Sequence, residues 1–112
     1  MKWSMRRKQT GETGEALAAR YLHRKGYRLL ERNYTCEVGE IDLIAEDRGT
    51  VVFVEVKTRR SREHGAPEEA VDREKRRRIR RAAHWYLQPW SRWPQAIRFD
   101  IVGIELADDD RI

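Results

Sequence analysis

Cysteine and long apolar runs are scarce in this chain of 112 residues. Cys36 is the one cysteine, so no disulfide can form within the chain and no cysteine-based zinc site can be assembled. No stretch is long and apolar enough to cross a bilayer, and no apolar run follows the charged opening segment Met1–Lys8. We therefore expect a soluble, cytoplasmic protein with no membrane partner.

Positive charge, carried mostly by arginine, is what the chain has in excess. Lysine and arginine total 24 against 19 aspartates and glutamates, which gives a formal net charge of +5. The planar fork of arginine matches phosphate oxygens, so nucleic acid is the first partner to consider, although charge does not distinguish DNA from RNA. The alternative is a solvated helix face that binds nothing. Basic residues crowd into one segment: Lys57, Arg59, Arg60, Arg62, Arg73, Lys75, Arg76, Arg77, Arg78, Arg80 and Arg81.

The length fits one domain over residues 1–112, in which residues 1–9 are expected to be flexible and residues 107–112 to form an acidic tail. Apolar spacing, turn residues and capping signals predict an α/β protein with the order helix, three strands, helix, strand. The predicted elements are a helix at Thr10–Lys25 capped by Gly26, strands at Tyr27–Thr35, Gly39–Glu46 and Val51–Thr58, a polar loop at Ser61–Ala66, a helix from Pro67 to Leu87, and a strand at Ala96–Leu106.

Each predicted helix carries one charged residue on or beside its apolar stripe. In the first helix Glu15 shares a face with Ala18 and Leu22, at spacings of three, four and seven residues. In the second, Lys75 lies at the margin of the buried stripe, which we predict to contain Val71, Ile79, Ala82, Ala83, Tyr86 and Leu87.

The two central strands are predicted to form a hairpin through Asp47–Thr50, and its register places Asp42 opposite Glu55. Directly opposed side chains of an antiparallel pair lie close together, so the two carboxylates converge on one face. Phe53, Glu55 and Lys57 share that face because residues two apart point to the same side. The opposite face is wholly apolar and is predicted to be core: Ile41, Leu43 and Ala45 against Val52, Val54 and Val56.

Converging carboxylates repel each other unless a cation lies between them. Hard oxygen ligands of this kind suit Mg²⁺ or Mn²⁺, which need one or two carboxylates besides waters and phosphate oxygens. Such an ion polarises a phosphodiester, and Lys57 would add positive charge where the reacting phosphate becomes more negative. Glu15 could reach the same cluster. In the alternative interpretation, the repulsion between Asp42 and Glu55 is relieved by Lys57 in solvent and has no catalytic meaning.

Two strings carry a family resemblance, Gly39-Glu-Ile-Asp-Leu-Ile-Ala45 and Phe53-Val-Glu-Val-Lys-Thr-Arg59. They resemble the YraN family of small bacterial proteins, which is related to the archaeal-type Holliday junction resolvases of the restriction-endonuclease-like superfamily, with its Asp…Glu-x-Lys signature. The resemblance extends to Gly11-x-x-Gly-Glu-x-x-Ala18, Tyr21-Leu22, Arg32-Asn-Tyr34, His64-Gly-x-Pro67, Lys75 and Arg98-Phe-Asp100.

The resemblance implies a restriction-endonuclease-like fold, with a mixed central β-sheet flanked by helices, and metal-dependent hydrolysis of phosphodiester bonds. By position, Glu15, Asp42 and Glu55 would be the metal ligands and Lys57 the catalytic lysine. Resolvase relatives act as dimers on branched DNA, which implies a homodimer with two such sites. The chain departs from the superfamily signature at Ile41, where a proline often precedes the aspartate.

Charge and residue type indicate the roles of the residues outside the acid cluster. Trp85, Trp90 and Trp93 are interpreted as packing residues rather than as stacking platforms for unpaired bases, with a dimer contact as an alternative for the last two. The three histidines are not expected to be ligands, and Cys36 is interpreted as a partly buried filler. The residues predicted to bind nucleic acid are Arg59, Arg60, Lys75, Arg76, Arg77 and Arg80.

Two functions from different classes remain open at the level of sequence. The first is a metal-dependent endonuclease that hydrolyses DNA, either nonspecifically or with selectivity for branched or junction structures. The second is a noncatalytic nucleic-acid-binding module that retains the nuclease fold, with an RNA-associated accessory protein as a weaker third. The set Glu15, Asp42, Glu55 and Lys57 favours catalysis, because binding alone has no use for a costly acidic cluster.

Overall fold

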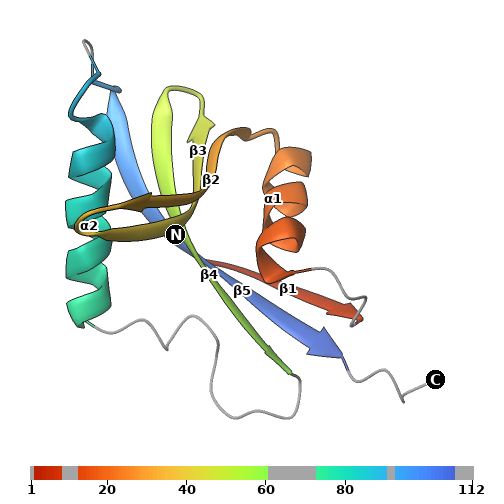
Figure 1. Ribbon diagram of the computed structural model, residues 1–112. Coiled ribbons are helices and arrows are strands. Elements are labelled where there is room, and N and C mark those ends of the chain that lie inside the picture. The colour runs from red at the N-terminus through yellow and green to blue at the C-terminus, as the bar shows by residue number, and fades with distance from the viewer. Residues whose placement is uncertain (1, 9–12, 61–72, 91–92, 108–112) are drawn as a thin grey trace.

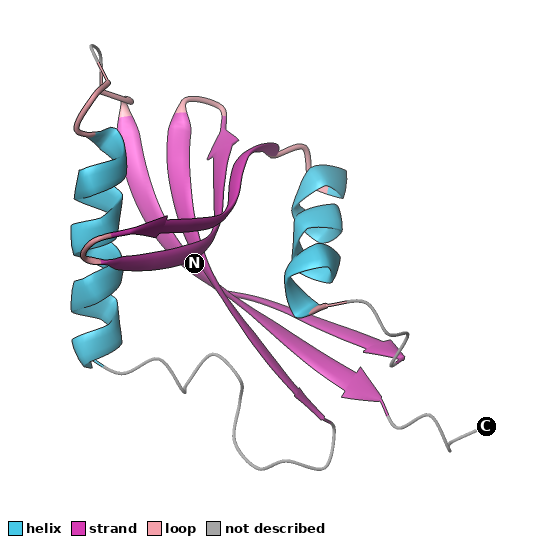
Figure 2. Ribbon diagram, viewed as in Figure 1, coloured by secondary structure: helices cyan, strands magenta, loops and turns pink. Residues whose placement is uncertain are grey.

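The computed structural model describes residues 2–8, 13–60, 73–90 and 93–107. One five-stranded mixed sheet, in the order β1-β5-β4-β3-β2, is flanked by α1 and α2 (Figures 1 and 2). The predicted α/β class, a mixed sheet with flanking helices, is confirmed. The elements are β1 (Lys2–Lys8), α1 (Gly14–Arg24), β2 (Arg28–Cys36), β3 (Gly39–Asp47), β4 (Thr50–Arg60), α2 (Arg73–Leu87) and β5 (Ala96–Ala107).

Strand β1 is the element that the sequence prediction lacks. It pairs in parallel with β5, from Lys2 opposite Ile101 to Lys8 opposite Ala107. The order predicted from sequence began with a helix and was therefore wrong at its start. Residues 10–12, the loop and helix start at 61–72, and the acidic tail at 108–112 lie outside the described residues.

Helix α1 begins and ends at residues whose chemistry explains its bounds. The hydroxyl of Thr13 accepts a hydrogen bond from the backbone N–H of Ala16 at 3.1 Å, which satisfies one of the amides that the first turn leaves without a partner. Just beyond the other end, Gly26 has a φ of +94°, the left-handed conformation that glycine adopts without strain. The predicted cap at Gly26 is confirmed.

The β3–β4 hairpin has the predicted register, with Leu43 opposite Val54 and Asp47 opposite Thr50. Its turn consists of Arg48 and Gly49, both with positive φ (52° and 88°), the combination that favours a two-residue hairpin turn. The ladder between the two strands ends at Leu43, so β3 leaves β4 before Asp42 is reached.

The two faces of the sheet bury separate apolar clusters. On one face, Leu43 and Val54 pack with Leu22 of α1, and on the other, Ile44 and Phe53 pack with α2. Ile41 belongs to the α2 cluster, which corrects its predicted place beside Leu43. The cause is the departure of β3 from β4, after which the tip of the β2–β3 hairpin turns toward α2 (Figure 1).

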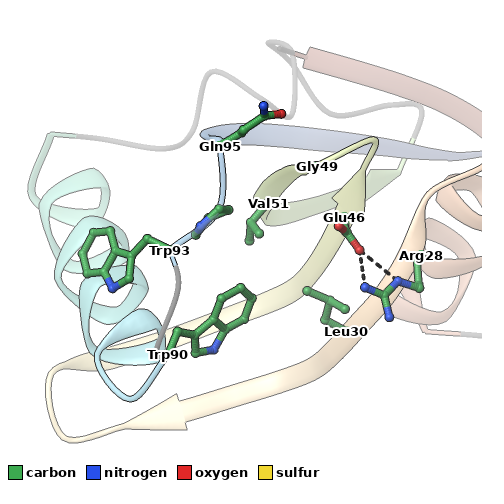
Figure 3. Close-up of a pocket in the computed structure, with 9 residues that line it drawn as sticks. Arg28, Leu30, Glu46, Gly49, Val51, Trp90, Trp93 and Gln95 are labelled. Atoms are coloured by element: carbon green, nitrogen blue, oxygen red, sulfur yellow. Dashed lines mark hydrogen bonds and ion pairs between the residues drawn. The ribbon is translucent and has the colours of Figure 1, made fainter.

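Beside the β3–β4 turn, a hollow of about 310 Å³ lies between the strands and the segment after α2 (Figure 3). Trp90 and Trp93 line one side of it, while an ion pair between Arg28 and Glu46 lines the other. Trp90 is partly buried and meets the ring of Tyr86 edge-on at 5.6 Å, as a packing residue should. Trp93, however, is 48% exposed, so the packing interpretation was wrong for this residue.

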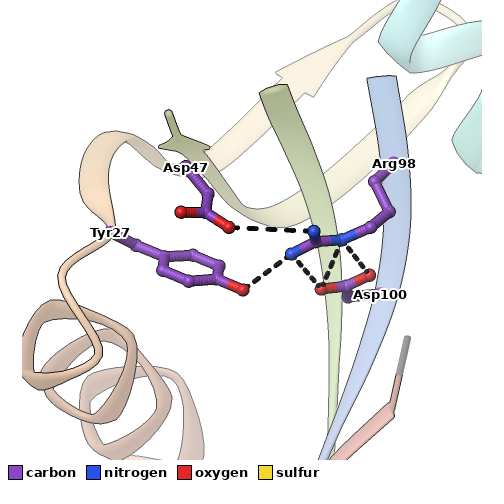
Figure 4. Close-up of polar contacts among 4 residues, drawn as sticks. All are labelled: Tyr27, Asp47, Arg98 and Asp100. Atoms are coloured by element: carbon purple, nitrogen blue, oxygen red, sulfur yellow. Dashed lines mark hydrogen bonds and ion pairs between the residues drawn. The ribbon is translucent and has the colours of Figure 1, made fainter. Parts of the chain in front are cut away.

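A polar network at the same end of the sheet joins β3, β5 and the segment between α1 and β2 (Figure 4). Arg98 of β5 donates three hydrogen bonds, of 3.0, 3.1 and 3.2 Å, to the two carboxylate oxygens of the buried Asp100, and one of 2.7 Å to the hydroxyl of Tyr27. Its remaining amino group lies 3.8 Å from the carboxylate of Asp47. The hydrogen bonds and paired charges raise the pKa of Arg98, so this guanidinium stays charged while it holds the network.

Candidate active site

Strand β4 supplies the centre of the site. Val54 and Glu55 are consecutive, so they point to opposite faces: Val54 into the α1 cluster, and Glu55 to the side of Phe53 and α2. Glu55 is 7% exposed, and within the described residues only it and Asp100 are both polar and buried. A carboxylate that is removed from water needs partners, so its surroundings determine what the site can do.

Asp42 reaches this site in a way that the sequence did not predict. Because the β3–β4 ladder ends at Leu43, Asp42 is not backbone-paired with Glu55 as expected. Instead its carboxylate Oδ2 accepts a hydrogen bond of 2.8 Å from the backbone N–H of Val56. The side chain thus takes the place of the missing strand acceptor, and this bond fixes the carboxylate beside β4, where it raises the pKa of Glu55 electrostatically.

Lys75 of α2 is the third member of the site. Its ammonium forms an ion pair with Oε2 of Glu55, and its side chain is 35% exposed while that of Glu55 is 8% exposed. The lysine precedes Ile79 by one helical turn, so it projects from the helix face that packs on the sheet. The sequence predicts Lys75 at this margin, with a nucleic-acid contact and a structural role as alternatives, but does not predict its pairing with Glu55.

Lys57 completes a cluster of two carboxylates and two amines. It follows Glu55 on the same face of β4, is partly buried, and is close enough to Lys75 for that amine to lower its pKa. The cluster formed by Asp42, Glu55, Lys57 and Lys75 is called the acid–lysine site below.

The electrostatics of the acid–lysine site follow from burial and from these pairings. Burial raises the pKa of Glu55, and the nearby charge of Asp42 acts in the same direction, while Lys75 and Lys57 oppose the shift. The hydrogen bond with Lys75, together with burial, lowers the pKa of Lys57. Burial also acts to lower the pKa of Lys75, but its hydrogen bonds to Glu55 and Lys57 outweigh that effect and the pKa is raised. Lys75 is therefore the amine that holds its proton more firmly.

Glu15 does not join the two acids in a three-ligand set. Across the described residues, no three histidine, cysteine, aspartate or glutamate side chains are grouped so that they could hold a metal ion. The reason is architectural: α1 packs on the face of the sheet opposite to Glu55, and its first turn meets β4 at Thr58. A Cβ added at Gly14 would lie 2.0 Å from the Thr58 hydroxyl oxygen, which shows how closely the two elements approach there.

The donor set fits a hard divalent cation with few protein ligands. Asp42 and Glu55 provide carboxylate oxygens, and Asp42 uses only Oδ2 in its hydrogen bond to Val56. Mg²⁺ is commonly held by one or two carboxylates, with water and phosphate oxygens completing its shell. The ion pair with Lys75 involves Oε2 of Glu55, so Oε1 is the Glu55 oxygen outside that ion pair.

The predicted nucleic-acid-binding arginines divide into two groups. Arg59 is 17% exposed at its side chain and lies 3.9 Å from Glu105 of β5, so it is less accessible than expected. The side chain of Arg60 lies outside the described part of the chain. In contrast, Arg76, Arg77 and Arg80 are exposed on α2, which confirms that this helix presents arginine to solvent.

The structure also shows the surroundings of the other residues considered from sequence. Cys36 is partly buried against the α2 cluster, as predicted. Trp85 is 45% exposed, so the packing interpretation was wrong for it as well as for Trp93. His84 meets the ring of Trp93 edge-on at 5.7 Å. None of the helices in the described residues has the length and apolarity to span a membrane.

The fold and site define a small mixed α/β protein with a partly buried acid–lysine site beside an arginine-rich helix. The chain belongs to the uncharacterised protein family UPF0102, whose model matches residues 14–104, and the resemblance to YraN-type proteins is thereby confirmed at the level of the family. It is 45% identical over 109 residues to a UPF0102 protein of Moorella thermoacetica, covering 97% of this chain and 91% of that relative. It is also 49% identical over 105 residues to UPF0102 protein STH1475 of Symbiobacterium thermophilum, covering 94% and 89%.

Proposed function

We propose that this protein is a divalent-metal-dependent endonuclease that hydrolyses phosphodiester bonds in DNA, built on a restriction-endonuclease-like fold. The observation that carries the proposal is the placement of Asp42 and the buried Glu55 side by side, with Lys57 on the same face of β4. Burying the Glu55 carboxylate beside the half-buried carboxylate of Asp42 costs stability, and packing alone gives no reason to retain the two acids.

Each residue of the acid–lysine site has a part in the proposed reaction. Asp42 and Glu55 would hold Mg²⁺ or Mn²⁺, which supplies charge stabilisation to the phosphate and makes an attacking water easier to deprotonate. Lys57 would place an ammonium against the phosphate as its negative charge grows. Lys75 neutralises Glu55 in the metal-free protein and keeps the carboxylate in position.

The arginines of α2 supply the binding surface for the DNA backbone. Arg76, Arg77 and Arg80 are exposed on the same helix that delivers Lys75 to Glu55, so phosphate contacts and the acid–lysine site belong to one element. Affinity should fall with salt, with a log–log slope of roughly −0.9 per phosphate neutralised. We further propose that the protein acts on branched DNA as a homodimer with two such sites. We propose that it does so in the cytoplasm.

The ion pair between Lys75 and Glu55 favours a second candidate, a noncatalytic nucleic-acid-binding module. The cluster contains as many amines as carboxylates, so it can be neutral without a metal ion. In that case the site would be structural, and the arginines of α2 would carry the whole function.

One cleavage experiment separates the two candidates. The full chain is incubated with labelled linear, flapped and four-way-junction DNA in Mg²⁺, in Mn²⁺ and in chelator. Glu55→Gln and Lys57→Ala are compared with Glu40→Gln, a matched control that removes an exposed acid of β3. We expect metal-dependent cleavage that is lost in the first two variants and kept in the control. Binding with no cleavage in any metal would leave the binding module as the better description.

A further inference from the structure

The outward face of α2 carries a stripe that the acid–lysine site does not use. Arg77, Arg81 and Trp85 follow one another at intervals of four residues, so they lie in one row along the helix, and all three are exposed. We call these three residues the outer stripe. Trp85 is 45% exposed, which is unusual for the largest apolar side chain when a core lies directly behind the helix.

Two hollows adjoin the outer stripe, and Trp85 lines both. One, of about 420 Å³, is bounded by Val38 from the β2–β3 hairpin tip and by Arg77, Arg80 and Arg81 of α2. The other, of about 900 Å³, extends past Trp85 toward the aromatic rings of Tyr34 and Trp90. Trp85 therefore stands on a ridge between a basic hollow and an aromatic one.

The support beneath this ridge is rigid. Tyr86 meets Tyr34 edge-on at 5.1 Å and Trp90 at 5.6 Å, and Tyr86 packs against the buried α2 cluster. The hairpin also lies against α2, since a Cβ added at Gly39 would be in van der Waals contact with the carbonyl oxygen of Arg78, at 3.4 Å. The exposure of Trp85 thus belongs to a well-packed element.

We propose that the outer stripe binds unpaired nucleotides of a nucleic-acid strand, with a base stacked on Trp85 and backbone phosphates at Arg77 and Arg81. Single-strand sites combine a positively charged groove with aromatic stacking faces, which is the combination found here. A base can stack on an exposed indole only when it has left its own duplex stack, so the stripe selects unpaired nucleotides over intact duplex.

Charge decides between this occupant and a protein partner. The exposed residues of α2 include many arginines and one glutamate, Glu74, which lies 3.6 Å from Arg77. Such a surface suits a polyanion, and an apolar protein surface would leave the arginines without compensation.

Strand binding at the outer stripe extends the proposed function. The path of the strand from the stripe to the acid–lysine site rests on that proposed function. Lys75 and Trp85 are ten positions apart on one helix, or about 15 Å along its axis. A strand held on the outer stripe can therefore present its duplex portion to the acid–lysine site, a geometry that matches a junction between paired and unpaired DNA.

The test measures binding in chelator, so that cleavage plays no part. Full-length protein is titrated into fluorescein-labelled oligothymidylate and, separately, into a blunt duplex of the same length, and anisotropy gives the two affinities. We expect Trp85→Ala to weaken oligothymidylate binding by about tenfold, the range of one lost stacking contact, and to change duplex binding little. Trp85→Phe, which keeps an aromatic face, should restore most of the loss.

Two matched controls accompany these variants. Trp93→Ala removes a tryptophan of similar exposure that lines the separate hollow beside the β3–β4 turn, and it should leave oligothymidylate affinity nearly unchanged. Arg81→Ala should weaken binding and its salt dependence, whereas Arg24→Ala on α1 should do neither. Circular dichroism of each variant confirms that the fold is kept.

The inference is overturned by equal oligothymidylate affinity in wild type and Trp85→Ala, or by a loss that is equal on single strand and duplex. It fails separately from the proposed function. Protein that cleaves DNA but shows no Trp85-dependent single-strand binding keeps the nuclease and loses the stripe. Protein that binds through Trp85 but cleaves nothing keeps the stripe and loses the nuclease.

Discussion

The two faces of the central sheet are built from alternate residues of the same strands, yet they differ in what they bury. The α1 face buries an apolar cluster along β4, in which Val52 and Val54 meet Leu22. The α2 face buries Phe53 in the same way but continues into Glu55, with its lysines and with Asp42. Both faces therefore stabilise the domain through their apolar clusters, while the α2 face in addition gives up some stability to hold charges in place.

The largest expected effect comes from breaking the stabilising face. Leu43→Ala removes a fully buried side chain from the α1 cluster, and we expect a loss of about 3 kcal/mol in the free energy of unfolding. Urea denaturation followed by circular dichroism measures it. Leu29→Ala, at a leucine that is 37% exposed, should cost much less, and equal costs would show that the α1 face has no special part in stability.

A smaller loss is expected on the charged face. Lys75→Met keeps the aliphatic stem but leaves Glu55 buried without its ion-pair partner, which should cost about 2 kcal/mol, less than for fully buried pairs because Lys75 is partly exposed. Adding Glu55→Gln to Lys75→Met should recover most of this loss. A double variant as unstable as the sum of the two single ones would contradict the pairing, as measured in a double-mutant cycle.

Metal binding should offset part of the stability that the charged α2 face gives up. If Asp42 and Glu55 hold Mn²⁺, wild type gains about 1.4 kcal/mol of stability at ten times the dissociation constant. Asp42→Asn should abolish this gain, whereas Glu40→Gln should keep it. Thermal unfolding with and without Mn²⁺ provides the measurement, and an equal response of wild type and Asp42→Asn would remove Asp42 from the proposed site.

The smallest effect is a difference in pH dependence. Burial raises the pKa of Glu55 above its ordinary value of 4.5, so the folded chain holds this proton at a pH where the unfolded chain has released it. The contribution of Glu55 to stability is therefore present below that value and is lost as the pH rises through the raised pKa. Unfolding midpoints of wild type and Glu55→Gln are measured in metal-free buffer from acid to neutral pH. As the pH rises from 4.5 through the raised pKa, the wild-type midpoint should fall relative to that of the variant, so that the two curves converge or cross. Parallel curves would contradict the raised pKa.

The sequence predicted those features of the fold and site that depend on local rules. Thr13, Gly26 and the Arg48–Gly49 turn act through their immediate neighbours, and strand alternation alone puts Glu55 and Lys57 on one face. These rules closely predict the bounds of α1. They also predict the hairpin register and the nearness of Asp42 to Glu55.

Features that depend on distant partners were missed. Strand β1 is added to the sheet by parallel pairing with β5, at the far end of the chain, and local sequence contains no signal for such a pairing. The end of the β3–β4 ladder at Leu43 depends on where the β2–β3 hairpin meets α2. The exposure of Trp85 likewise depends on which side of α2 the sheet covers, and Tyr86 and Leu87 occupy that side.

The hydrogen bond that the Val56 amide donates to Asp42 makes this amide a spectroscopic probe of the Asp42 carboxylate. An amide proton shared with a carboxylate resonates at a position that depends on the charge of that carboxylate. Any cation that approaches Asp42 draws charge away from Oδ2 and lengthens the bond of 2.8 Å. A single peak in a nitrogen–proton correlation spectrum of the labelled protein would thus show whether a cation binds at Asp42, without substrate, turnover or mutation.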